Sequence, residues 1–449
     1  MKISMLIALT LLLASTITFT ASAATEEEIE LSIEEGLAWL AAQQNPDGGW
    51  GDDDSRMTAV TAFALIKLQM RARELGYDSP FDPDYPYSVN VKRGWEYMFD
   101  EVNMIPTYSA AQAISSQTHD GTADDPDVNG NGIGVLFLNP SPFYNVYTTG
   151  ITVMALEASG TPGRVNDGGI DYDGDGSADT FMEVAQDAVE WLAFAQGDSG
   201  NDEGGWDYRA LDNQTDDAST DNSNSGYAAL GIAAGEAFGC SVPEWLKEEL
   251  DVWIGTIQDP VDGDDDDGGS WYNPDWPENP WVNELKAGNL IFEMTLAGDT
   301  PSEPRFGDAM DYITRHWRDE DNDPGWGYNQ DTSHYQAMYC LMKGLEYSRE
   351  EHIDLDGVGV PEHDWYQEFA DVIVSQQNPD GSWPASDYGD DILNTIWALL
   401  TLERIAPPPP PPPVGGAVYP VDKIRLYAII GAPTLLAAAL IILAQAKRK

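Results

Sequence analysis

The sequence has little cysteine and little histidine for its length. Two of its 449 residues are cysteine, Cys240 and Cys340, and five are histidine. Two cysteines rule out the disulfide framework that holds many small secreted domains together. They leave two alternatives open, a single bridge between them or two buried thiols.

Positive charge is also scarce. The chain has 22 Lys and Arg residues against 77 Asp and Glu residues, which gives a formal net charge of −55. Such a surface repels polyanions, so nucleic acid and anionic surfaces are excluded as partners. An acid excess of this size indicates a saline environment, the binding of divalent cations, or both.

Alternating runs typical of β-strands are missing as well, and a different pattern recurs along the chain. Two apolar residues are followed by Gln and then by Gly-x-Trp, first as Trp39, Leu40, Gln44, Gly48 and Trp50. The clearest second copy is Val372, Ile373, Gln377, Gly381 and Trp383; looser copies begin at Trp95, Trp191, Trp253 and Tyr312, and the copy at Trp253 ends in Gly269 and Trp271. The copies recur about every sixty residues, with one long insertion in the second, so the chain is built from structural repeats.

Each copy leads into a second segment with helical spacing that is rich in small or aliphatic residues. These segments begin at Met57, Tyr147, Asn224, Asn283, Ser333 and Leu393. A helix pair cannot bury its apolar face alone, so six pairs must stack on one another. The small residues of the second helices suit a crowded inner ring, and the acidic residues of the first helices suit an outer one. The sequence therefore predicts an all-α fold, an α/α toroid of six helix pairs (an α6/α6 barrel) with long acidic loop insertions.

The recurring Gln and Trp have a structural interpretation. Asn-Pro-Asp-Gly stops a helix and reverses the chain, and Gly supplies the backbone angles that the turn needs. The Gln side chain satisfies backbone groups that the helix end leaves open, and the Trp ring covers them. We therefore expect these residues to be scaffold rather than catalytic.

At these residues, the chain resembles the squalene-hopene cyclase and protein prenyltransferase superfamily, whose members carry this Gln-Trp repeat on an α/α toroid. The resemblance covers roughly residues 33 to 405 and implies two kinds of site. The cyclases protonate an alkene with Asp-x-Asp-Asp; the literal match, Asp264, Asp266 and Asp267, falls in an acidic turn where a dry cavity is not expected. The prenyltransferases bind zinc through Asp, Cys and His, and Gln336 stands at the position that matches the His. We expect no zinc. Asp390 and Asp391 are interpreted as a helix cap.

The two ends of the chain predict passage through a membrane and anchoring in it. Residues 1–23 are predicted to form a cleaved signal peptide, and residues 24–405 are predicted to form the extracellular toroid. A Pro-rich linker follows at residues 406–423, then an apolar stretch at residues 424–444 that is long enough to span a bilayer, then a basic tail at residues 445–449. The expected topology is a secreted, type I, single-pass surface protein that meets the membrane through its C-terminal helix.

Two acidic loops predict calcium. Asp171, Asp173, Asp175, Ser177 and Asp179 fit the first nine positions of a calcium-binding loop, with Gly176 where the chain must turn sharply. The twelfth position is Met182 instead of Glu, and Glu183 follows one residue later. Asp127, Asn129 and Asn131 repeat the opening of the pattern. Both loops lie in the enlarged region between the second and third repeats, so we expect calcium to be structural.

Three functions compete. The first is a surface toroid that binds a hydrophobic or glycan ligand, or a partner, without chemistry of its own; its predicted cavity residues are Tyr147, Tyr227, His334, Tyr335 and Trp397. The second is a terpenoid cyclase-like enzyme acting on an apolar lipid, which needs a buried acid. The third is a polysaccharide-cleaving enzyme, which needs two carboxylates, and no pair stands out in the sequence. The unmatched catalytic motifs favour the first.

Overall fold

The computed structural model describes residues 23–51, 57–99, 109–114, 117–119, 122–139, 144–198, 200–210, 220–260, 263–274, 281–319, 325–327, 333–385 and 389–405. Helices of two kinds alternate along this part of the chain. The first kind comprises α2 (Glu26–Ala42), α4 (Ser88–Met98), α6 (Phe181–Ala195), α8 (Glu244–Ile257), α10 (Pro304–His316) and α12 (Trp365–Gln376). The second comprises α3 (Met57–Glu74), α5 (Asn145–Ala158), α7 (Asn222–Phe238), α9 (Glu284–Ala297), α11 (Tyr335–Ser348) and α13 (Asp391–Leu402). The predicted six helix pairs are confirmed.

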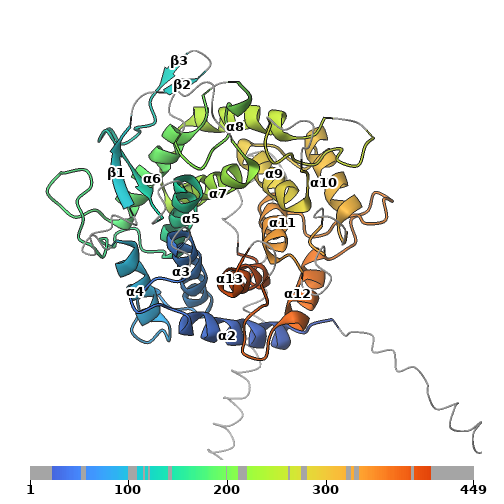
Figure 1. Ribbon diagram of the computed structural model, residues 1–449, viewed down its shortest axis with the longest axis horizontal. Helices are drawn as coiled ribbons and strands as arrows, with labels where there is room; N and C mark the ends of the chain where they lie inside the picture. The colour runs from blue at the N-terminus through green and yellow to red at the C-terminus, as the bar shows by residue number, and fades with distance from the viewer. Residues whose placement is uncertain are drawn as a thin grey trace, which may run out of the picture. The chain divides into compact units, whose positions relative to one another are not determined.

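The second helices of the pairs form a closed inner ring (Figure 1). Each packs against the next in chain order from α3 to α13, and α13 packs back against α3. Outside them, α2 at the start of the chain contacts α12 at its end. The predicted closure at six is therefore confirmed.

Burial explains which helices lie inside. Most of α7 is buried, whereas α10 buries little more than one stripe. Small residues let the inner helices approach closely: a Cβ on Gly150 of α5 would lie 2.2 Å from the carbonyl oxygen of Tyr227 in α7, and one on Gly288 of α9 would lie 2.6 Å from the backbone of Cys340 in α11. The Ala- and Gly-rich inner segments are thus required by the packing.

The repeated Gln does more than close its own turn. The side-chain Nε2 of Gln44 donates to the carbonyl of Gly48 at 2.8 Å and to the carbonyl of Asn90, at the start of the next outer helix, at 2.9 Å. Gln196, Gln258 and Gln377 make the same pair of bonds in their repeats. Trp50 lies beneath the turn, and its Nε1 donates to the carbonyl of Leu40 at 2.8 Å. The scaffold role predicted for Gln and Trp is confirmed, and each Gln also joins one repeat to the next.

One copy of the motif lies one residue away from its predicted alignment. Gln258 bonds to the carbonyl of Gly268 instead of Gly269, and Gly268 has the positive φ of 81° found at the other turns. Ser270 therefore occupies the buried position that Trp50 fills in the first repeat, and Trp271 is only partly buried. The acidic insertion in this turn changes the spacing between Gln and Gly, so the one-residue shift of the motif could not be recognised from the sequence.

The prediction that the chain lacks strands was wrong. The insertion between α4 and α5 contains two antiparallel pairs, β1 (Ser109–Ala113) with β4 (Ile133–Phe137) and β2 (Gln117–His119) with β3 (Thr122–Asp124). Strand β4 packs against both α5 and α6, and four of its five residues are buried. A strand covered on both faces reads as a continuous apolar run, so it shows no alternation.

The predicted segments at the two ends fall almost entirely outside the described residues. This applies to residues 1–22 of the signal peptide and to the linker (406–423), the membrane span (424–444) and the tail (445–449). Among the described residues, no helix has the length and apolar character needed to cross a bilayer. The anchoring of the chain stays a prediction.

Both cysteines are free and buried. Cys340 lies on α11, and Cys240 follows the C-terminal end of α7. Burial raises the pKa of the Cys240 thiol to about 12. Of the two alternatives that the sequence left open, the structure shows two buried thiols.

Candidate functional site

A cavity of about 490 Å³ is lined by residues from all six inner helices. The lining residues lie near the N-terminal ends of these helices, or in the loops that lead into them. They are Ala59, Val60 and Phe63 of α3; Tyr147 and Ile151 of α5; Ser223 and Tyr227 of α7; Leu285 and Lys286 of α9; Gln336 of α11; Leu393 and Trp397 of α13; and Tyr144, Tyr208, Tyr272, Trp281 and Asn283 of the loops. Because the N-terminus of a helix carries partial positive charge, this end of the ring favours an anionic or hydrogen-bond-accepting group.

Aromatic rings dominate the wall and brace one another. Phe63 and Tyr227 meet edge to face with their ring centroids 5.8 Å apart, and Tyr144 and Tyr208 meet in the same way at 5.3 Å. Gln336 donates from Nε2 to the Tyr227 hydroxyl oxygen at 3.4 Å. Rings held in this way offer an apolar surface with polar atoms at fixed points, as small-molecule pockets do.

Lys286 is the single charged side chain among the described lining residues. Only 2% of its surface is exposed, and its ammonium lies 4.0 Å from the centroid of the Trp281 ring and 5.9 Å from that of Tyr272. A cation held against aromatic faces is stabilised by their quadrupoles, so its position is fixed. It can bind an anionic group that enters the cavity.

A buried carboxylate lies behind the wall. Asp221 caps the N-terminus of α7, where its Oδ1 accepts hydrogen bonds from the backbone N–H groups of Ser223 and Asn224. Burial raises the pKa of Asp221 to about 6, although these hydrogen bonds oppose the shift. The Asp221 charge in turn contributes to the raised pKa of the lining residue Tyr208, whose main cause is burial. The position of the Asp221 carboxylate is thus set by hydrogen bonds at the N-terminus of α7 and not by contacts in the cavity.

Three of the five predicted cavity residues, Tyr147, Tyr227 and Trp397, line the cavity, and two do not. His334 caps α11, where its Nδ1 accepts from the backbone N–H of Ala337 at 3.2 Å, and the hydroxyl of Tyr335 donates to Gln376 in the outer helix α12 at 2.7 Å. On a helix, neighbouring positions point about 100° apart, so Gln336 faces the cavity instead.

The sequence also missed Phe63, Ile151, Lys286 and four loop residues. The four are Tyr144, Tyr208, Tyr272 and Trp281. The four loop residues could have been predicted from one feature of the sequence, the aromatic residues in the loops that lead into the inner helices.

The Asp-x-Asp-Asp match lies away from the cavity. Asp264, Asp266 and Asp267 belong to the loop after α8, which rests on the outer helix α10, where Arg315 donates to the carbonyl of Asp267. Asp264 is exposed, and the other two are partly exposed. Asp390 caps α13 by accepting from the backbone N–H of Leu393 at 2.9 Å, as predicted.

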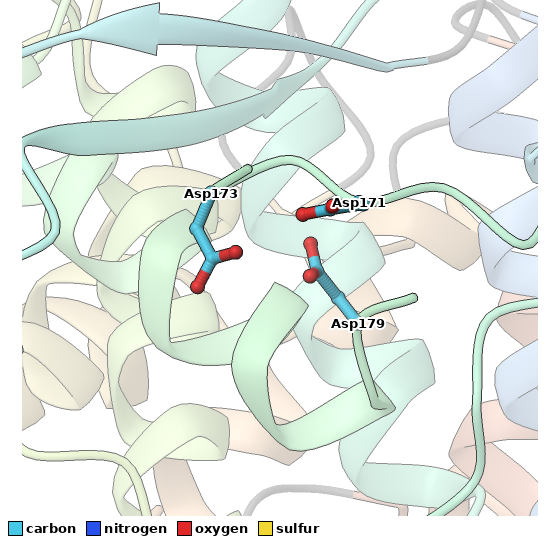
Figure 2. A group of neighbouring side chains, drawn as sticks. All are labelled: Asp171, Asp173 and Asp179. Atoms are coloured by element: carbon cyan, nitrogen blue, oxygen red, sulfur yellow. The ribbon is translucent and has the colours of Figure 1, made fainter. Parts of the chain in front are cut away.

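The Asp171 loop (residues 171–179) brings three carboxylates together. Oxygens of Asp171, Asp173 and Asp179 lie within 4.8 Å of one another, and Figure 2 shows the three side chains pointing toward a common centre. Oδ2 of Asp171 accepts from the N–H of Gly176 at 2.9 Å, which folds the loop around its first ligand position. Burial raises the pKa of Asp179 to about 6. Such a group of oxygens suits a hard divalent cation.

The other positions of the Asp171 loop take different roles. Asp175 Oδ1 accepts from the N–H of Ser177 at 2.7 Å, and Asp175 lies outside the group of three. Glu183, one residue beyond the expected twelfth position, forms a capping box with Thr180 at the start of α6. Its carboxylate therefore caps the N-terminus of α6. This role explains why the Glu lies one residue beyond the twelfth position of a standard calcium-binding loop.

The Asp127 loop (residues 127–132) folds in the same way. Oδ1 and Oδ2 of Asp127 accept from the N–H groups of Gly130 and Gly132 at 2.8 and 2.9 Å. A third loop that the sequence analysis missed shares this arrangement, since Asp354 accepts from Gly357 and Gly359. In all three loops, an Asp carboxylate that accepts from backbone N–H groups fixes the turn.

Comparison with known proteins supports the architecture. No protein-family model matches the chain, and no curated protein matches it. A GH76 α-mannanase from Bacteroides thetaiotaomicron is similar in structure, with a TM-score of 0.50 and 13% identity over 84% of this chain and 95% of that one. The chain is an α/α toroid. The type II terpene cyclase MstE from Scytonema, without ligand, gives a TM-score of 0.43 at 14% identity over 84% of this chain and 98% of the cyclase. At 13% identity, the likeness to the mannanase concerns the fold alone.

Proposed function

We propose that the toroid is a binding protein whose central cavity takes a mainly apolar small molecule with an anionic or hydrogen-bond-accepting end. The observation that carries this proposal is the lining itself, in which aromatic rings surround one ammonium and the described residues include no carboxylate. A volume of about 490 Å³ lies within the usual range for small-molecule pockets, roughly 300–1,000 Å³. The apolar end of the ligand would pack between Phe63 and Ile151, and its polar end would face Lys286.

The two enzymatic alternatives need groups that the described lining does not supply. A class II cyclase requires an acid in the cavity, and Asp264, Asp266 and Asp267 rest on the outer helix α10 instead. A glycosidase requires two carboxylates across the scissile bond, and the described wall offers Tyr, Ser, Asn, Gln and Lys groups. These residues bind and orient a ligand, so we favour binding over either reaction.

Filling the cavity tests the proposal. The probe is 1-anilinonaphthalene-8-sulfonate, an apolar anion whose fluorescence rises when it leaves water. Ile151→Trp places a larger side chain in the cavity and should weaken binding of the probe at least tenfold. Val252→Trp makes a similar change on the exposed face of α8 and should leave binding unchanged. If both variants bind the probe as the native chain does, the cavity is not the binding site.

We further propose that the toroid is secreted, held at the cell surface by residues 424–444, and stabilised by calcium in the Asp171 loop and the Asp127 loop. The three converging carboxylates support calcium in the first loop. Calcium would order an insertion that contains few helical hydrogen bonds of its own. Asp171→Ala and Asp173→Ala should each remove calcium uptake from this loop in isothermal titration. Uptake equal to that of the native chain would refute the assignment.

A further inference from the structure

The outer helix α6 buries two acidic side chains beside the Asp127 loop. Asp187 and Glu190 are one turn apart, and their exposed fractions are 1% and 0%. Neither carboxylate pairs with Lys or Arg among the residues that the structure describes. Because buried carboxylates are stable only when they are neutralised or fully hydrogen-bonded, this pair requires an explanation.

Hydrogen bonds tie both acids to the loop. The backbone N–H of Asn129 donates to Glu190 Oε1 at 2.9 Å, and its side-chain Nδ2 donates to Asp187 Oδ1 at 2.6 Å. The Nδ2 of Asn131 donates to the same oxygen of Asp187 at 3.0 Å. Glu190 Oε1 accepts a further hydrogen bond from Gln186, but Oε2 is buried and has no hydrogen-bond partner.

The Asp127 loop lacks the carboxylates that a calcium loop needs. Asp127 is its single acid at the first three ligand positions, where Asn129 and Asn131 supply amide oxygens, and Leu138 occupies the twelfth position, where a standard loop has a bidentate Glu. Glu190, whose Oε1 already bonds to Asn129 of this loop, has in Oε2 a second oxygen that is available as a ligand from another part of the chain.

We propose that Asp187 and Glu190 complete a calcium site with Asp127, Asn129 and Asn131, which attaches the insertion to the outer helix α6. This deepens the proposed role of calcium in the Asp127 loop and rests on it. In this structure the amide oxygens of Asn129 and Asn131 accept from the backbone N–H groups of Asn131 and Ile133, both at 2.9 Å. On binding, the two amide groups give up these bonds and turn over, so that their oxygens face the cation and the Asp187 carboxylate is released to the metal. The site then links the start of β4 to α6, where Trp191 already donates to Gln112 of β1 at 3.2 Å.

Calcium titration of the full chain, with stoichiometry read by calorimetry, tests this site separately from the Asp171 loop. Glu190→Gln and Asp187→Asn keep the side-chain volume and should each weaken one of two binding events at least tenfold. Asp171→Ala should abolish the other event. The matched control is Glu249→Gln, which changes a buried acid on the neighbouring outer helix α8 and should bind calcium as the native chain does.

The outcomes separate the two proposals. If Glu190→Gln and Asp187→Asn retain native stoichiometry and affinity while Asp171→Ala loses a site, the shared site is refuted and the Asp171 loop stands. If the native chain takes up no calcium, both proposals fail.

Thermal unfolding distinguishes a calcium-coordinating role of Glu190 from a role in packing alone. Without calcium, Glu190→Gln should melt at the same temperature as the native chain or a higher one, because it removes a buried charge. With calcium, the native chain should melt at the higher temperature. An equal difference in melting temperature under both conditions would assign Glu190 a packing role and overturn the proposal.

Discussion

The side-chain amide of Gln377 donates a hydrogen bond of 2.8 Å to the carbonyl of Ser32, which lies 345 residues earlier in the chain. The hydroxyl of Ser32 returns a bond of 2.7 Å to Gln377 Oε1, and Gln377 also donates to the carbonyl of Gly381 at 3.0 Å. These contacts join the last repeat to the first. The same Gln that links neighbouring repeats elsewhere therefore closes the ring.

Gln377→Ala should lower the free energy of unfolding by about 1–3 kcal/mol, because the loss of several hydrogen bonds leaves partly buried carbonyls without a donor. Gln43→Ala is the control, since the side-chain amide of Gln43 donates within its own helix to Trp39 at 3.4 Å. It should cost less than about 0.5 kcal/mol. Urea unfolding followed by circular dichroism measures both, and equal losses would contradict the role of Gln377 in ring closure.

Two glycine substitutions should change stability in opposite directions. Gly381 has a φ of 96°, and a Cβ there would lie 2.5 Å from the carbonyl oxygen of Glu35 in α2, so Gly381→Ala should destabilise the fold by more than about 2 kcal/mol. Gly255 lies in α8 with open space around it, so Gly255→Ala should stabilise it by about 0.5–1 kcal/mol. Differential scanning calorimetry should show melting temperatures on either side of the native value.

Asp221 should make the toroid less stable as the pH rises from 4 to 6. Burial raises its pKa from 3.8 to about 6, so the folded chain holds a proton that the unfolded chain releases. The proton on Asp221 stabilises the folded chain fully below pH 4. This stabilisation is lost as the pH rises through 6, which lowers the free energy of unfolding by at most about 3 kcal/mol. Asp221→Asn should flatten this part of the stability curve relative to the native chain. Asp364→Asn, at the exposed cap of α12, should leave it unchanged.

Lys286 should determine the charge preference of the cavity. Lys286→Met keeps a long apolar side chain and removes the ammonium, so binding of 1-anilinonaphthalene-8-sulfonate should weaken about tenfold, or about 1.4 kcal/mol. Binding of the neutral dye Nile red should stay within about twofold of native binding. Lys247→Met on α8 serves as the control. Equal losses for the two dyes would assign Lys286 a packing role.

The predicted anchor can be tested by fractionation. The full chain should sediment with membranes and require detergent for release, because residues 424–444 are long and apolar enough to span a bilayer. A chain that ends at residue 405 should stay in the soluble fraction. Recovery of the full chain without detergent would contradict the prediction.

Local chemistry made the repeat predictable. Gln44, Gly48 and Trp50 act within a few residues of one another, so their spacing is a constraint that the sequence itself records. The loop geometry at Asp171 is predictable for the same reason, since Gly176 must turn the chain toward the first carboxylate. Strand β4 was not predictable from the sequence, because burial on both faces removes the alternation that marks a strand.

The sequence by itself determined that this protein has six helix pairs and that small residues pack its inner helices. Helical periodicity and turn chemistry are short-range properties, and six copies repeat them. Only the tertiary structure decided that Gln336 and Lys286 face the cavity while Tyr335 faces an outer helix, and that Asp187 and Glu190 meet the Asp127 loop. These relationships depend on the rotational phase of each helix and on contacts between residues about sixty positions apart, neither of which local spacing fixes.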